Sequence, residues 1–304
     1  MKEFSIPSKG KGNLHCCKWE PEGEVRGVVQ LVHGIAEYTA RYDELAGYLA
    51  GQGYVVVGED HMGHGGSISE DTVQGYYYGG WLNAVDDTYS LLKKTKSEYT
   101  GIPYFLYGHS MGSFMARTIL YRYPDAGLAG ALISGTGWQP GLVLKLGLAI
   151  CRAEAKKHGD TYVSAAVKKL MFGGYTKGYE NPRTELDWLS SDSKVVDAYI
   201  EDPLCGFDAT VGLSMAMLDG MMMNEKRDNL KRMPKELPVY FFSGDRDPVG
   251  DDGKGVLRTF SAFEKAGMKD VSLKLYSQGR HEMHNELNRD EVYTDVLGFL
   301  NEHA

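Results

Sequence analysis

The sequence predicts an α/β protein built on a mostly parallel, doubly wound β-sheet with helices on both faces. Short apolar runs such as Tyr54–Val57 alternate with segments of helical apolar spacing, which is typical of this architecture. The alternation stops over residues 137–227, which contain helical patterns and no convincing strand. We therefore expect a core made of residues 1–136 and 228–304, and an inserted helical unit over residues 137–227.

The strands and helices of the core can be placed individually. The expected strands are Glu3–Ile6, Asn13–Trp19, Val28–Val32, Tyr54–Val57, Tyr104–Tyr107, Leu128–Ile133, Pro238–Phe242 and Val271–Tyr276. The expected helices cover residues 42–49, 81–92, 115–122, 256–263 and 292–300. Gly51 ends the first helix and Pro124 ends the third.

Composition excludes several classes of function. A chain of 304 residues with 42% hydrophobic residues can bury a sizeable core, and its net charge of −8 argues against nucleic acid as a partner. Residues 1–13 contain no apolar signal-peptide segment, and no apolar run is long enough to cross a bilayer. The four cysteines form no pairing pattern and no zinc-site spacing occurs, so we expect a cytoplasmic protein without metal or cofactor.

Ser110 is the candidate nucleophile. It lies in Gly108-His109-Ser110-Met111-Gly112, directly after an apolar run, and this strand–serine–helix arrangement is typical of a nucleophile elbow. The residues two before and two after the serine must be small because the turn is tight, and glycine occupies both positions. The serine oxygen would then lie at a helix N-terminus, which favours developing negative charge.

A nucleophilic serine needs a histidine base and an orienting carboxylate, and both candidates follow Ser110 in the chain. The acid could be Asp245 or Asp247, after the strand ending near Phe242, with Asp251 and Asp252 as weaker alternatives. We favour Asp247, because it lies beyond the turn that Asp245 is suited to hold. No acidic residue occurs from residue 126 to 153, which excludes an acid one strand earlier.

His281 and His284 compete for the role of base, and both follow the last strand. We favour His281, which is closer to the strand end, and expect His284 to be a hydrogen-bonded neighbour. His109 is expected to pack away from the nucleophile. The other loop histidines, His33, His61 and His64, are expected to tie loops together.

The oxyanion of an acyl-transfer intermediate is usually held by two backbone amides. One amide should belong to Met111, the residue after the nucleophile. The strand Val28–Val32 is followed by His33 and Gly34, where the backbone can turn sharply. The amide of Ile35 is then the natural second donor.

Five segments together resemble one branch of the α/β-hydrolases, the monoacylglycerol lipase and lysophospholipase-like branch of serine-aminopeptidase type. Residues 33–42 are similar to its H-G-x-x-E-x…R-Y segment, and residues 60–67 to its D-x-x-G-H-G-x-S loop. Residues 108–112 match its elbow, 244–247 its acid loop and 281–286 its final loop. The match spans the chain outside roughly residues 137–227.

This resemblance implies an α/β-hydrolase fold and a serine esterase. The family acid falls on Asp247, the family base on His281, and the two oxyanion amides on Ile35 and Met111. It further implies a monoacylglycerol or lysophospholipid substrate and a helical cap, formed by residues 137–227, over the active site.

Two apolar stretches of the insertion have alternative interpretations. Residues 142–150 could meet acyl chains or a membrane surface, or could simply pack the cap on the core. The methionine cluster of residues 215–223 could line a tunnel for flexible chains or belong to an ordinary core.

Three functions follow from these residues, and the leading one is hydrolysis of a monoacyl ester by a Ser110–His281–Asp247 triad. A peptidase of prolyl-aminopeptidase type would use the same triad and would need cap carboxylates to hold a substrate amine. A binding protein with little turnover would use only the pocket under the cap. The sequence does not specify an oligomeric state.

Overall fold

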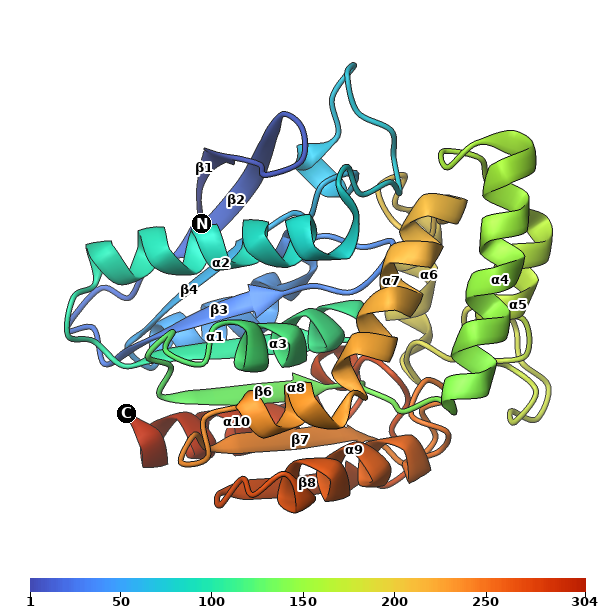
Figure 1. Cartoon of the computed structure of the whole chain (residues 1–304). Helices are drawn as coiled ribbons and strands as arrows, with labels where there is room; N and C mark the ends of the chain where they lie inside the picture. Colours follow the sequence, from blue (N-terminus) through green and yellow to red (C-terminus); the bar gives the residue numbers. More distant parts are fainter.

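The computed structural model describes residues 1–304 and contains one eight-stranded sheet, in the order β1-β2-β4-β3-β5-β6-β7-β8 (Figure 1). The strands are β1 (Lys2–Pro7), β2 (Asn13–Trp19), β3 (Gly27–Val32), β4 (Tyr54–Glu59), β5 (Tyr104–His109), β6 (Gly130–Ser134), β7 (Val239–Gly244) and β8 (Val271–Tyr276). Strand β2 pairs antiparallel with β1 and β4, and the pairs from β4 to β8 are parallel. Every expected strand is present within two residues of its predicted bounds, so the predicted α/β fold is confirmed.

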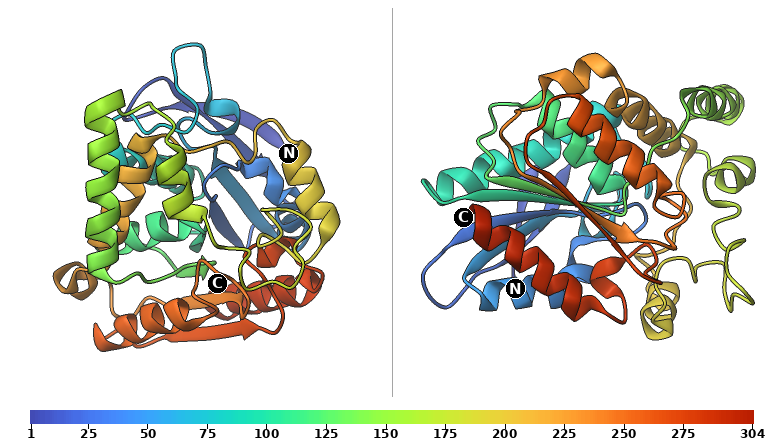
Figure 2. Two further views of the ribbon diagram at one scale, coloured as in Figure 1. Left: turned by 90° about the vertical axis from the view of Figure 1, so that its right-hand side faces the viewer. Right: turned by 90° about the horizontal axis from the view of Figure 1, so that it is seen from below.

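Helices cover both faces of this sheet. Successive residues of a strand point to opposite faces, and the residues of the parallel strands are apolar on both, so both faces must be covered. The helices α1 (Asp43–Gly51) and α10 (Arg289–His303) bury their apolar stripes against one face. The helices α2 (Gly80–Glu98), α3 (Met111–Arg122) and α9 (Lys254–Lys265) cover the other face. In the view from below, α10 lies on the opposite side of the sheet from α3 and α9 (Figure 2).

Five helices and no strand connect β6 to β7: α4 (Gly141–His158), α5 (Ala165–Phe172), α6 (Ser193–Glu201), α7 (Val211–Asn224) and α8 (Arg227–Arg232). Helix α7 packs on α2 and α3, while α4 packs on the outer side of α7 (Figure 1). Both α4 and α5 stand clear of the sheet, beyond the carboxyl ends of its parallel strands (Figure 2). No helix in the structure is both long and apolar enough to span a bilayer.

The turn between β5 and α3 explains the two glycines of the predicted elbow. A Cβ atom on Gly108 would lie 2.5 Å from the carbonyl oxygen of Gly112, and one on Gly112 would lie 1.9 Å from the carbonyl oxygen of Val32. No side chain fits either position without moving backbone. The first turn of α3 is thereby pressed against the end of β3, next to the loop that begins at His33.

We expect Gly112→Ala to lower the free energy of unfolding by about 3 kcal/mol, because the added methyl group must displace the end of β3. Urea denaturation followed by circular dichroism measures the effect. Gly47→Ala is the matched control, since Gly47 lies in α1 with no atom within 4 Å of the added Cβ. It should be neutral or stabilising by up to about 1 kcal/mol. Equal stability of Gly112→Ala and wild type would contradict the packing argument.

Candidate active site

Ser110 occupies a strained backbone conformation at the junction of β5 and α3. Its φ of 53° and ψ of −122° lie where residues with a Cβ atom are rare. The surrounding structure holds this conformation: the Ser110 amide donates to the carbonyl oxygen of Ser134 at 3.0 Å, and its carbonyl accepts from the amide of Ser113 at 2.9 Å. Such strain is common at functional sites and is consistent with a nucleophile elbow.

His281 and Asp247 form a buried pair. Both carboxylate oxygens of Asp247 lie 3.0 Å from Nδ1 of His281. The carboxylate also accepts hydrogen bonds from the Ser243 hydroxyl and the Val249 amide, each at 2.9 Å. Asp245 instead accepts from the amide of Gln278 at 2.8 Å and holds the neighbouring turn. The geometry therefore pairs Asp247, and not Asp245, with the histidine.

Ser110 and His281 line the same cavity, which has a volume of about 590 Å³. Because Nδ1 of His281 faces Asp247, Nε2 is the ring nitrogen left for a hydroxyl group. Gly34 and Gly135 show how closely the loops after β3 and β6 approach Ser110 and His281. A Cβ atom on Gly34 would lie 3.1 Å from Cβ of Ser110, and one on Gly135 would lie 3.0 Å from Cε1 of His281.

The two candidate oxyanion amides belong to Ile35, which lines this cavity, and to Met111, which follows Ser110 in the chain and does not line it. Ile35 lines the cavity with Ser110, and its amide donates to no acceptor in the protein. Met111 is the first residue of α3, where helix amides have no intrahelical acceptor. The preceding amide, that of Gly34, is already used, because it donates to Oε1 of Glu37 at 2.6 Å. Ile35 and Met111 are therefore available to a developing negative charge beside Ser110.

The electrostatics single out His281 among the rings of the cavity. Burial lowers the pKa of His281, but the negative charge of Asp247 and its hydrogen bond outweigh burial, so the pKa lies above its ordinary value. Burial lowers the pKa of His284 to about 3. Burial, together with the nearby rings of His281 and His284, holds the pKa of His109 well below its ordinary value.

Two expectations about these histidines are wrong. Neither ring nitrogen of His284 has a hydrogen-bond partner, and its ring instead stacks on Tyr42 with centroids 4.3 Å apart. His109 does not point away from the site. Its ring lines the cavity 4.6 Å from the ring of His281, and its Nδ1 contacts the Ser134 hydroxyl at 3.2 Å. Sequence adjacency could not reveal this, because it does not report the direction of a side chain.

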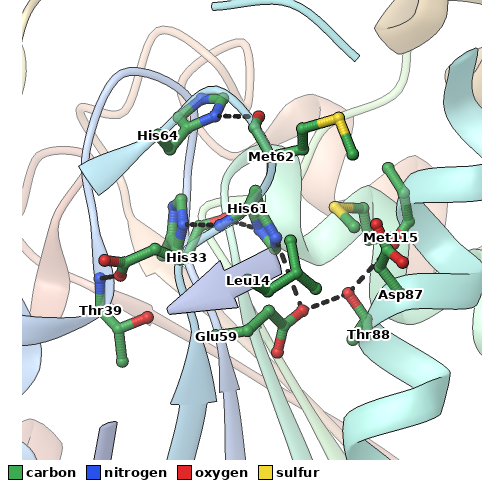
Figure 3. A network of polar contacts seen from close by, with 12 residues as sticks. Leu14, His33, Thr39, Glu59, His61, Met62, His64, Asp87, Thr88 and Met115 are labelled. Atoms are coloured by element: carbon green, nitrogen blue, oxygen red, sulfur yellow. Dashed lines mark hydrogen bonds and ion pairs between the residues drawn. The ribbon is translucent and has the colours of Figure 1, made fainter. Parts of the chain in front are cut away.

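Of the three histidines of the early loops, His33 and His61 tie their loops together as expected, whereas the ring of His64 hydrogen-bonds only the Met62 carbonyl of its own loop, at 3.0 Å, and its Nε2 has no partner (Figure 3). The His61 amide donates to Nε2 of His33 at 2.9 Å, and Nε2 of His61 lies 3.1 Å from the carbonyl oxygen of His33. Nδ1 of His61 lies 3.5 Å from Glu59, which also accepts from Thr88 on α2. This network supports the start of the loop that carries Gly34 and Ile35.

A buried ion network connects the loop after β3 to the loop after β8. Sequence patterns did not predict this network. Arg41 binds Glu282 through two hydrogen bonds of 2.8 and 2.7 Å, and binds Glu37 at 2.6 Å. Burial acts to raise the pKa of Glu282, but the charge of Arg41 and its hydrogen bonds prevail and lower it to about 2. The resemblance covered Glu37, Arg41 and Glu282 as motif positions, and only the structure brings them together.

The insertion supplies most of the cavity wall, including Phe172, Leu186, Trp188, Ile200 and Phe207. It also contacts the histidine loop directly, because the amides of His281 and Glu282 donate to the carbonyl oxygens of Trp188 and Leu189.

The two apolar stretches of the insertion behave differently. In α4, Leu144, Leu148 and Cys151 are buried, whereas Leu142, Val143 and Leu146 are 80%, 51% and 61% exposed. The methionines of residues 215–223 pack in or against the main core and do not line the cavity, which favours the ordinary-core interpretation.

Comparisons with known proteins place the chain among serine hydrolases. The family model described as serine aminopeptidase, S33, matches residues 23–288. The monoglyceride lipase of Mus musculus is 29% identical over 95% of this chain and 85% of its own length. The monoacylglycerol lipase of Mycolicibacterium smegmatis is 28% identical over 99% of this chain and 97% of its own. A thermostable carboxyl esterase from Bacillus coagulans, solved in complex with glycerol, gives a TM-score of 0.92 at 30% identity and covers 99% of this chain and 98% of its own.

We expect Asp247→Asn to lower the pKa of His281, because it removes the charge that offsets burial. Histidine-labelled NMR titration measures this directly, with the wild-type ring titrating above its ordinary value. Asp245→Asn is the matched control and should leave the titration unchanged, since Asp245 bonds only the turn at Gln278. An unchanged His281 pKa in Asp247→Asn would contradict the pairing.

Proposed function

Because the chain belongs to the serine aminopeptidase S33 family of α/β-hydrolases, we propose that it is a serine carboxylic-ester hydrolase acting on monoacylglycerols or similar monoacyl lipids. One observation carries the proposal: the strained Ser110 and the buried His281–Asp247 pair share one cavity. The cavity volume of about 590 Å³ is within the range of small-molecule sites.

In the proposed mechanism, Ser110 Oγ attacks the ester carbonyl carbon while His281 Nε2 removes its proton. Asp247 holds the imidazole in the required tautomer and stabilises the imidazolium that forms. The amides of Ile35 and Met111 bind the oxyanion. His281 then protonates the departing alcohol, and water hydrolyses the acyl-enzyme by the same route, which returns the free serine and releases the fatty acid.

The substrate class is supported by the relatives and by the lining of the cavity. The curated relatives from mouse and from M. smegmatis are a monoglyceride lipase and a monoacylglycerol lipase, and both align over most of the chain. Apolar side chains of the insertion, such as Phe172 and Leu186, suit the acyl chain of such a lipid. We propose that residues 137–227 form the cap that selects it.

The charges of the cavity favour an ester over a peptide with a free amine. Four carboxylates line it, and three of them already have cationic partners. Glu37 and Glu282 bind Arg41, and Asp208 binds Lys168 at 2.6 Å. Only Glu185 remains, and it is exposed. A substrate ammonium group would therefore find no buried free carboxylate, which counts against a prolyl-aminopeptidase activity.

The outer face of α4 supports a transient contact with a lipid surface. Leu142, Val143 and Leu146 are exposed on this helix, and Lys145 lies among them. An apolar face with an adjacent cation suits the boundary between headgroups and acyl chains. Such contact would deliver a membrane-dissolved substrate to the cap. A cytoplasmic location stays a prediction; all four cysteines are free and buried.

We expect Ser110→Ala to reduce hydrolysis of monoacylglycerol by about 10⁴-fold or more, because the acyl-enzyme cannot form. Fatty acid release measures turnover, and a fluorophosphonate probe measures labelling of the serine. The matched control is Ser90→Ala, whose hydroxyl bonds only the Asp86 carbonyl on α2 and whose loss should leave both readouts intact.

The same assay separates the competing functions. Esters of medium and long acyl chains should be turned over and proline arylamides should not. Preference for the arylamides would establish the peptidase instead. Absence of labelling in the wild-type protein would favour a binding protein with little turnover.

We expect the double variant Leu142→Ser with Leu146→Ser to bind phosphatidylcholine vesicles at least about tenfold more weakly, because two exposed apolar side chains are lost. Vesicle sedimentation measures binding. Turnover of a soluble short-chain ester should be unchanged. Leu257→Ser, which alters a 46% exposed leucine on α9, is the control and should bind like wild type. Unaltered vesicle binding in the double variant would remove α4 from this role.

A further inference from the structure

The loop that follows β3 contains a second strained residue, Ala36. Its φ of 55° lies in the left-handed region, which a residue with a Cβ atom enters only at a cost in free energy. Ala36 is buried and directly follows Ile35, which lines the cavity and whose amide has no acceptor in the protein. Ala36 therefore restrains Ile35 from its C-terminal side.

The insertion holds this strained residue in place. The Ala36 carbonyl oxygen accepts two hydrogen bonds, one from the hydroxyl of Tyr199 on α6 at 2.8 Å and one from the amide of Gly206 at 2.9 Å. A third bond joins the same two segments, because the Tyr38 hydroxyl donates to Asp202 at 2.7 Å. Tyr199 is itself fixed, since its buried ring lies over the Arg41 guanidinium at 4.7 Å.

The core holds the peptide group that carries the Ile35 N–H, because Nδ1 of His33 lies 2.7 Å from the Gly34 carbonyl oxygen of the same peptide. The His33 carbonyl is bound by His61, and the Gly34 amide is bound by Glu37. Beyond Ile35, both hydrogen bonds to the Ala36 carbonyl come from the insertion. Loss of these two bonds would weaken the restraint on Ile35 from its C-terminal side, where the core holds only the side chain of Glu37, through Arg41 and Tyr42.

We propose that Tyr199 is a positioning residue for the oxyanion hole. Its hydroxyl holds Ala36 in the left-handed conformation and so aims the Ile35 amide at the carbonyl group attacked by Ser110. The cap is then part of the catalytic apparatus as well as a cover over the substrate. This inference rests on the proposed function, in which the Ile35 amide binds the oxyanion.

Tyr199→Phe tests the proposal, because it removes one hydroxyl group and keeps the ring over Arg41. With a short soluble ester such as p-nitrophenyl acetate, kcat should fall by about tenfold while KM changes little. Labelling by a small fluorophosphonate should slow by a similar factor. A merely structural role would lower the melting temperature and leave kcat at 25 °C unchanged.

Ala36→Gly provides a second test. Glycine adopts positive φ readily, so residue 36 would no longer need the Tyr199 hydrogen bond to keep its conformation. In the Ala36→Gly background, Tyr199→Phe should lower kcat by no more than about threefold. Tyr54→Phe is the matched control: it removes a hydroxyl bond from a buried tyrosine to Asn301, far from the cavity, and should leave kcat unchanged.

The outcomes are separable from those of the proposed function. If wild-type protein is not labelled at Ser110 at all, the hydrolase proposal itself fails. If wild type is labelled and Tyr199→Phe matches it in kcat and labelling rate, the hydrolase stands and the positioning role is overturned. An equal loss from Tyr199→Phe with and without the Ala36→Gly change would also overturn it, because the hydroxyl would then act independently of the strained residue.

Discussion

The close approach of α3 to the end of β3 is the constraint on which the rest of the site depends. A side chain on Gly112 would overlap the carbonyl oxygen of Val32, so only glycine lets the helix start this close to the strand. The consequence is that Ser110, at the helix start, lies against the loop that begins at His33. The candidate nucleophile after β5 and the candidate oxyanion amide after β3 thus belong to neighbouring loops, although 75 residues separate Ile35 from Ser110 along the chain.

Buried charge fixes the remaining loops relative to this pair. Arg41 binds Glu37, next to the candidate oxyanion amide, and Glu282, next to the candidate base. Taking these charges out of water costs much of their mutual attraction, so such a network is weak evidence for stability. Its hydrogen bonds are directional, however, and they link the loop after β3 to the loop after β8. We interpret the network as fixing the position of the loop after β3 relative to the loop after β8.

The sequence predicted the order of the elements and the candidate site residues, but not the contacts between loops. Short continuous apolar runs located most of the strands, because a parallel strand that is buried on both faces leaves such a run in the sequence. The pairing of Asp247 with His281 agreed with the preference argued from the turn at Asp245. The contacts of Tyr199 with Ala36 could not be predicted, because they join segments 163 residues apart and leave no periodic signal. His284 was misjudged for a related reason: stacking on Tyr42 satisfies its apolar faces, and no motif distinguishes this from hydrogen bonding.

The crowding of imidazoles around the candidate base has a simple electrostatic logic. A protonated ring beside His281 would oppose the positive charge that His281 carries in the proposed mechanism. Burial keeps the pKa of His109 and His284 far below neutral, so both rings stay uncharged at neutral pH. Only His281, among these three, has a carboxylate against its ring, and only its pKa is raised. The neutral ring of His109 lies 4.6 Å from that of His281, and the neutral ring of His284 lies 4.9 Å from that of His109, so neither adds a positive charge near His281. The difference lies in the balance of two effects: the charge of Asp247 outweighs burial at His281, whereas the charge of Glu282 does not outweigh burial at His284.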